Sequence, residues 1–144
     1  MIDPSELSKG KSSSSQCIFF GSILAGLAVA LGAFGKHVLL PILSKAALET
    51  WHTGAYYQLI HGMGIILAGL VAERAPHPQR AIRAGRMFLV GSILFSGSLC
   101  ALALTGAGIL GVLTPLGGLC FLGGWMLLAW SVKPGHPYPP QQHP

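Results

Sequence analysis

Charged side chains are absent from three long stretches of the chain. Asp, Glu, Lys and Arg do not occur in residues 12–35, 50–72 and 87–132. One crossing of the hydrocarbon core of a bilayer takes about 20 helical residues at a rise of about 1.5 Å each. The third stretch is long enough for two crossings, separated by the turn at residues 105–108. The pattern therefore predicts four membrane spans, near residues 18–35, 54–72, 86–104 and 109–132.

The predicted spans are helices, because backbone groups in lipid must form their hydrogen bonds within the segment. The alternating strands of about 10 residues that build an outer-membrane barrel do not occur in the sequence. Small residues recur four apart, as in the pairs Gly21 and Ala25 or Ser92 and Ser96, and such pairs let helix backbones approach closely. The expected fold is an all-α, integral membrane four-helix bundle.

Composition agrees with this fold class. Hydrophobic residues make up 51% of the chain and charged residues 9%, against about 25% charged in a typical soluble domain. Disordered chains have high charge and few large apolar groups, and disulfide scaffolds have many more than three cysteines. These three classes are excluded, and a small membrane protein remains.

The basic residues indicate the orientation. With four spans, both termini and the middle loop lie on one side, which holds Lys9, Lys11, Arg74, Arg80, Arg83, Arg86 and Lys133. The opposite side holds only Lys36 and Lys45. Because cytoplasmic loops carry the excess of Lys and Arg, both termini are expected in the cytoplasm. No aromatic residues are interleaved with the arginines, so nucleic acid is not an expected partner.

The segments outside the spans are predicted to be mostly irregular. Residues 1–17 form a polar tail rich in serine, residues 133–144 form a tail rich in proline, and both are expected to be disordered. The domain proper then covers residues 18–132. An alternative for the first span is a signal peptide cleaved after residues 28–30, but the apolar run continues to Gly35, which is the length of a span.

The loop between the first two spans has its own apolar pattern. Pro41 can open a short helix in the membrane interface, which ends near Trp51. Trp51 with Tyr56 and Tyr57 resembles an aromatic belt at the outer surface of the bilayer.

The second span carries the one ionisable side chain deep in the predicted membrane region, His61. It shares a helix face with Gln58 and lies about 12 Å below Thr53, close to the bilayer midplane. An intramembrane ionisable residue is a functional candidate. The structural alternative is a neutral histidine that shares a hydrogen bond with Gln58 or with a serine of the third span. The candidate polar site therefore consists of Gln58, His61, Ser96 and Ser98.

Acid–base catalysis and metal binding are not expected. The acidic residues outside the N-terminal tail are Glu49 and Glu73, on opposite sides of the membrane. No two histidines share a helix at ligand spacing, and Cys100 and Cys120 fall at different depths. The sequence thus predicts neither an enzyme nor a metal or cofactor site.

Several motifs occur together with His61. They are Leu31-Gly32-Ala33-Phe34-Gly35 followed by His37; Trp51, Thr53, Tyr57 and Gln58; residues 94–99; and Thr114-Pro115-Leu116-Gly117-Gly118 with Gly124-Trp125. In this set the sequence resembles a family of small four-helix inner-membrane proteins of bacteria, a domain of unknown function with a small eukaryotic transmembrane relative. Lys36 and Cys100 depart from the family pattern. The resemblance implies the fold and the bacterial inner membrane, and it carries no activity.

Three hypotheses for function follow. The first is a non-enzymatic structural or interaction unit of the membrane, surrounded by lipid and associating with copies of itself or with other membrane proteins. The second is a small transporter or channel component, in which Gln58, His61, Ser96 and Ser98 line a polar path. The third is a haem or metal carrier that uses His37 and His61.

Overall fold

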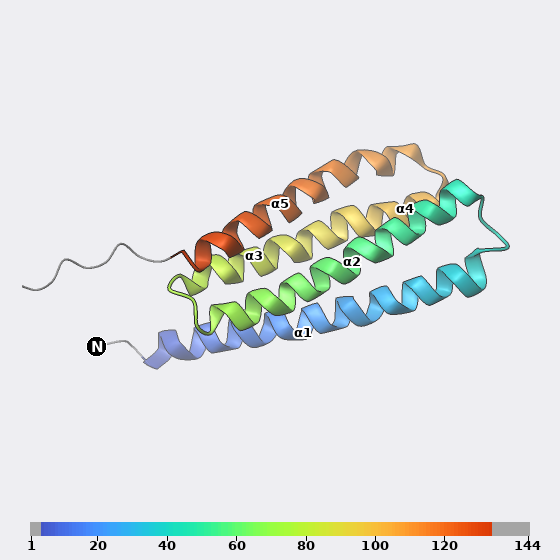
Figure 1. Ribbon diagram of the computed structural model, residues 1–144. Coiled ribbons are helices and arrows are strands. Elements are labelled where there is room, and N and C mark those ends of the chain that lie inside the picture. The colour runs from blue at the N-terminus through green and yellow to red at the C-terminus, as the bar shows by residue number, and fades with distance from the viewer. Residues whose placement is uncertain (1–3, 134–144) are drawn as a thin grey trace, which may run out of the picture.

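The computed structural model describes residues 4–133, with the backbone alone for residues 4–11, and is entirely helical with connecting turns over that range (Figure 1). Four long helical rods run side by side. The elements, in chain order, are α1 (Pro4–Phe34), the π-helical turn η1 (Gly35–Leu39), α2 (Lys45–Ala72), α3 (Pro78–Gly91), the π-helical turn η2 (Ser92–Gly97), α4 (Ser98–Thr105), the 3₁₀ turn η3 (Gly108–Val112) and α5 (Leu113–Ser131).

Local sequence signals set the helix ends. The Ser44 hydroxyl accepts a hydrogen bond from the N–H of Ala47 at 3.2 Å and so caps the first turn of α2. Pro78 stands at the start of α3, where its missing N–H costs nothing. Gly106 ends α4 with a φ of 69°, a left-handed conformation that glycine adopts without steric penalty.

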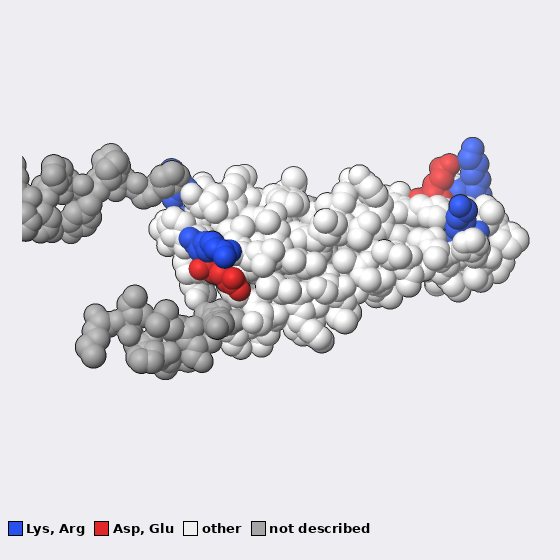
Figure 2. Space-filling view, turned by 60° about the horizontal axis from the view of Figure 1, so that its bottom comes forward, with Lys and Arg blue, Asp and Glu red and all other residues white. Residues whose placement is uncertain are grey.

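Four segments are long and apolar enough to cross a membrane, which confirms the predicted number of spans. They are Ser12–Leu39, Lys45–Ala72, Pro78–Thr105 and Gly108–Ser131. On the face shown in Figure 2, the Lys, Arg, Asp and Glu side chains gather at the two ends of the molecule, and the middle is uncharged. The molecule thus has the charge distribution of a multi-pass membrane protein.

Helices α2 and α3 form the central pair of the bundle. Helix α1 packs along α2 and touches α3, whereas α5 packs along α3 and touches α2 more lightly. Over residues 4–133, α1 and α5 do not pack against each other. The cross-section is therefore a rhombus with α2 and α3 on its short diagonal, and one groove lies on each side of that pair.

Close approach of backbones holds α1 against α2. A Cβ added to Gly21 would lie 2.7 Å from the carbonyl oxygen of Gly62, and one added to Gly62 would lie 2.9 Å from the backbone nitrogen of Ala25. Lipid tails are as apolar as leucine, so packing rather than the hydrophobic effect drives association of membrane helices. The predicted role of Gly21 and Ala25 as a contact pair is thus matched by the structure.

The helices extend further than the sequence predicted. Residues 4–17, predicted to be a disordered tail, are helical in α1, because no proline or glycine pair interrupts the chain after Pro4 and the polar turns continue the apolar helix. Helix α3 begins at Pro78 rather than at residue 86, and α5 follows η3 to Ser131. The predicted disorder of residues 134–144 lies outside the described residues.

The predicted interfacial helix before the second span is also wrong. Residues 40–43 form a turn, and α2 runs without a break from Lys45 to Ala72. Nor does Trp51 belong to an aromatic belt: its side chain is 3% exposed, and its indole N–H donates to the backbone carbonyl of Leu31 in α1 at 2.8 Å. Charged residues such as Lys45 and Glu49 do not stop a helix, and so the span starts earlier than the charge pattern indicates.

Candidate functional site

The predicted polar residues are all buried, yet they do not converge on one cavity. Gln58, His61, Ser96 and Ser98 are each at most 6% exposed. The Gln58 amide donates from Nε2 to the backbone carbonyl of Leu24 in α1 at 3.2 Å. His61, on the same helix, instead bonds to α5. The sequence predicted that His61 shares a hydrogen bond with Gln58 or with a serine, and this prediction of the partner is wrong.

Both ring nitrogens of His61 are engaged. Nδ1 lies 2.8 Å from the carbonyl oxygen of Tyr57, and Nε2 lies 3.3 Å from Nε1 of Trp125. An indole N–H can only donate, so Nε2 accepts, and Nδ1 must carry the proton that it donates to Tyr57. This pattern defines a neutral imidazole. A proton added at Nε2 would face the indole N–H and break the bond to Trp125.

Aromatic rings enclose the imidazole. It stacks on Phe121 at a centroid distance of 3.4 Å and an interplanar angle of 6°, and Phe88 lies 5.5 Å away. The Tyr57 ring, one turn earlier on α2, lies nearly parallel to the imidazole at a centroid distance of 6.0 Å. These contacts, together with the two hydrogen bonds, hold the ring in one orientation between α2, α3 and α5.

The two serines of the site differ from each other. The Ser98 hydroxyl donates to the backbone carbonyl of Phe95 at 2.9 Å. It also lies 3.0 Å from the Thr114 hydroxyl of α5. The Ser96 hydroxyl is fully buried and has no hydrogen-bond partner within the described part of the chain. Both lie in or just after the π-helical turn η2, where the regular pattern of backbone bonds is shifted.

A shallow groove between α2 and α5 reaches His61. Its cavity volume is about 600 Å³, and its floor includes Phe95 from η2. The walls are largely apolar and aromatic, with Tyr56, Tyr57 and Ile60 from α2 and Pro115, Gly118, Leu119, Phe121, Leu122 and Trp125 from α5. The groove opens toward the surface that lipid covers, and of the four predicted polar residues only His61 lines it.

Several motif residues mark close contacts between helices. A Cβ on Gly35 would lie 2.7 Å from the Trp51 ring, and the Phe34 ring lies 5.9 Å from that of Trp51. Gly117 packs against the backbone of Phe95, and Gly124 against the Phe88 ring. In contrast, Gly32 faces open space. Most of the motif thus places backbones and rings against each other.

Two further observations bear on metal binding. His37 is exposed in η1, at the end of the bundle where α1 turns into α2, whereas His61 lies about 24 Å along α2 from the start of that helix. Within residues 12–133, no three His, Cys, Asp or Glu side chains lie close enough to hold a metal ion, and Cys17, Cys100 and Cys120 are free thiols. His37 and His61 therefore do not form a joint ligand pair.

Trp125 is the partner that the sequence did not reveal. Phe121 and Trp125 are four residues apart, as are Gly117 and Phe121, and this spacing places all three on one face of α5. That signal identifies a face of α5 on which Gly117 and Phe121 are buried and Trp125 is partly exposed. It does not show that this face lies against His61. The spacing of residues along one helix does not determine how that helix is rotated relative to another.

Comparison with known proteins agrees with the fold. Residues 31–118 match the family described as protein of unknown function DUF423. The membrane protein YwdK of Bacillus subtilis is 40% identical over 111 residues, which cover 77% of this chain and 90% of that protein. A membrane protein of Staphylococcus haemolyticus is 39% identical over 114 residues, covering 79% and 92% of the two chains.

A more distant bacterium has a similar relative. A membrane protein of Haemophilus influenzae is 41% identical over 103 residues, which cover 72% of this chain and 82% of that protein. No solved structure matches the chain. With four apolar helices and these relatives, the chain is a multi-pass membrane protein that belongs to the DUF423 family.

Proposed function

We propose that the protein is a non-enzymatic structural unit of the membrane, in which the intramembrane polar side chains join helices rather than line a path. The observation that carries the proposal is the direction of their hydrogen bonds. Gln58 bonds to α1, His61 to α5, and Ser98 lies against Thr114 of α5. These three polar groups each contact a neighbouring helix, which fixes how the helices are rotated against each other, whereas Ser96 makes no such bond within the described residues.

The chemistry of the site also supports a structural role. A general acid or base needs a free nitrogen or oxygen within hydrogen-bond reach of a substrate. Both nitrogens of His61 are already bonded within the protein, and Phe121 covers one face of the ring. Residues 50–72 and 87–132 contain no carboxylate that could act with it. Association with copies of itself or with other membrane proteins stays a prediction of this proposal.

A transporter or channel component is the second candidate. The groove between α2 and α5 favours it, because the groove brings a cavity of about 600 Å³ to His61. Gln58, Ser96 and Ser98 do not line that cavity, so a continuous polar path through one copy is missing among the described residues. A pore would have to form between copies.

Flux through reconstituted protein distinguishes the two candidates. The full chain is placed in liposomes that enclose a pH-sensitive dye, and proton entry is measured under a potassium diffusion potential. The structural proposal predicts the same rate as in protein-free liposomes. A faster rate that the His61→Phe variant abolishes would overturn the proposal and establish the second candidate, provided that His52→Phe, the same change at an exposed residue of α2 outside the groove, retains it.

A further inference from the structure

A second cavity lies on the other side of the central helix pair, between α1 and α3. Its volume is about 160 Å³, and the α2 residue Ile65 stands at its back. The lining residues from α1 are Ser13, Gln16, Cys17 and Phe20, and those from α3 are Ile82, Gly85, Arg86 and Leu89. By volume it has room for about five groups of the size of a water molecule.

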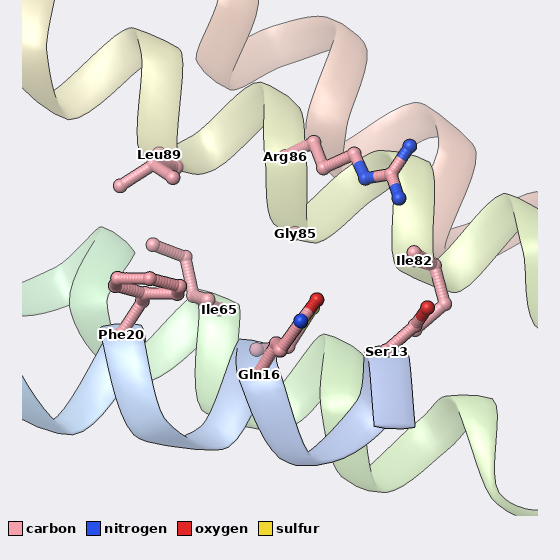
Figure 3. Close-up of a pocket in the computed structure, with 9 residues that line it drawn as sticks. Ser13, Gln16, Phe20, Ile65, Ile82, Gly85, Arg86 and Leu89 are labelled. Atoms are coloured by element: carbon pink, nitrogen blue, oxygen red, sulfur yellow. The ribbon is translucent and has the colours of Figure 1, made fainter. Parts of the chain in front are cut away.

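The two ends of this cavity differ in polarity. In Figure 3 the Arg86 side chain extends from α3 toward the end where Ser13 lies, and Gln16 points up from α1 into the gap. At the opposite end Phe20 and Leu89 face each other across the gap, with Ile65 beside them. One end therefore offers a cation with hydroxyl and amide groups, and the other end offers only hydrocarbon.

The Arg86 side chain makes no hydrogen bond or ion pair with the described residues 12–133. Arg80, two turns earlier on α3, donates to the backbone carbonyl of Trp130 at 3.2 Å. In contrast, no hydrogen bond or ion pair joins Arg86, Ser13 or Gln16 to another group of the described chain. The guanidinium thus keeps all five of its N–H donors for a group from outside the protein.

The position of Arg86 along α3 fits the depth of the lipid phosphates. The helical rod from Arg86 to Thr105 rises about 28 Å, close to the thickness of the hydrocarbon core of about 30 Å. The rod from Gln16 to Gly35 gives the same rise. If the outer helix ends stand at one hydrocarbon boundary, Arg86 and Gln16 stand at the other, and the apolar end of the cavity reaches into the acyl chains.

Gly85 closes the floor of the cavity. A Cβ at this position would lie 2.9 Å from Sγ of Cys17 and 3.4 Å from Cβ of Ala68. The three helices therefore meet directly below the cavity, which separates it from the groove at His61. An occupant must enter from the side, where lipid surrounds the protein.

From this arrangement we propose that the cavity between α1 and α3 binds an anionic glycerophospholipid. The phosphate accepts hydrogen bonds from Arg86, Ser13 and Gln16, and one acyl chain lies along Phe20, Leu89 and Ile65. A guanidinium suits this task because its donors match two phosphate oxygens at once. Anionic headgroups bind basic pockets between membrane helices in the same way. The inference does not depend on the proposed structural role.

Lipid binding to the purified full chain tests the site. The protein is held in a neutral detergent, and phosphatidylglycerol or phosphatidylcholine with identical acyl chains is added. Native mass spectrometry counts the bound lipid, and thermal unfolding gives the shift in Tm. We expect one tightly bound phosphatidylglycerol and a rise in Tm, with neither effect from phosphatidylcholine. Inorganic phosphate alone is expected to leave Tm unchanged, because it lacks the acyl chains.

Variants separate this cavity from the general basic surface. Arg86→Gln is expected to weaken phosphatidylglycerol binding about fivefold or more, the effect of losing one basic group at the membrane surface. Arg83→Gln is the control and is expected to retain binding. It makes the same change at an exposed residue of α3 that does not line the cavity. Leu89→Trp fills the apolar end and should also reduce binding.

Three results would overturn the proposal. The first is equal binding of the two lipids, and the second is an equal loss in Arg83→Gln and Arg86→Gln. The third is a rise in Tm with inorganic phosphate that matches the rise with phosphatidylglycerol, which would define a phosphate site and not a lipid site. If Arg86→Gln does not fold, Leu89→Trp replaces it in the comparison with Arg83→Gln, and binding that Leu89→Trp retains in full would overturn the proposal.

Discussion

The indole N–H of Trp125 donates to Nε2 of His61 over 3.3 Å, between side chains 64 residues apart in the chain. Helices α2 and α5 pack only lightly against each other, since α5 lies mainly against α3 and α2 lies mainly against α1. The hydrogen bond is therefore a direct polar link between two helices whose other contacts are few and include the stacking of His61 on Phe121. It also determines the tautomer of His61, with the proton on Nδ1.

The packing of α1 on α2 predicts a large effect of one added methyl group. Gly21→Ala places a Cβ 2.7 Å from the Gly62 carbonyl and 2.8 Å from the Ile66 side chain, so the helices must separate. Overpacking of this kind costs about 1–3 kcal/mol. The free energy of unfolding, measured in mixed micelles with increasing SDS, should fall by that amount.

Gly26→Ala is the matched control for that variant. It adds the same methyl group on the same helix, with nothing within 4 Å of the new Cβ. Its effect should stay within about 0.5 kcal/mol, as for other surface substitutions. Alanine also has the higher helix propensity, a gain that both variants share. A loss in Gly26→Ala equal to that in Gly21→Ala would show that contact with Gly62 does not set the cost.

Substitution of Trp51 should also lower the free energy of unfolding. The Trp51→Phe substitution removes the donor to the Leu31 carbonyl and shrinks a ring that is 3% exposed. The combined loss of hydrogen bond and volume is expected to be about 1–3 kcal/mol. Trp130→Phe, at a residue that is 54% exposed, should change stability by less than about 0.5 kcal/mol. An aromatic belt at the outer surface would instead make the two variants equivalent.

The distribution of basic residues predicts the orientation of the chain. In a background where Cys17, Cys100 and Cys120 are replaced by alanine, single cysteines are placed at Ile42 and at Ala75, in turns at opposite ends of the bundle. A membrane-impermeant maleimide should label Ile42→Cys in intact cells and Ala75→Cys only after the membrane is opened. The reverse pattern would place both termini outside the cytoplasm.

Span number was predictable from the sequence, whereas span ends were not. The bilayer core admits few charges, so gaps between charged residues count the crossings. The same charges do not end a helix, because Lys45 and Glu49 lie in water or headgroups and keep their backbone bonds. Residues 4–17 show the same effect at the start of α1. Helix ends follow Ser44, Pro78 and Gly106, which change the backbone itself.

The depth of His61 along its helix was predictable from the sequence, whereas its hydrogen-bond partner was not. The rise along α2 placed His61 near the midplane, and the structure has it buried in the middle of that helix. Its partner depends on how α5 is rotated about its own axis, and that rotation is set by Gly117 against Phe95 and Gly124 against Phe88. Such contacts arise from the packing of all helices together. Patterns within single helices therefore predicted Gln58 or a serine as the partner of His61, and not Trp125.

The central claim is that His61 joins α2 to α5, and a double-mutant cycle measures that link. The unfolding free energy is determined in mixed micelles for the unmodified chain, His61→Phe, Trp125→Phe and the double variant. Phenylalanine keeps a ring at each position. The loss of the bond from His61 Nδ1 to the Tyr57 carbonyl and the smaller ring at position 125 occur in the single and in the double variants, so the cycle cancels them. We expect a coupling energy of about 0.6 kcal/mol, and at most about 1.7 kcal/mol, as for other hydrogen bonds between membrane helices. Additive single effects, with no coupling between His61 and Trp125, would contradict the claim.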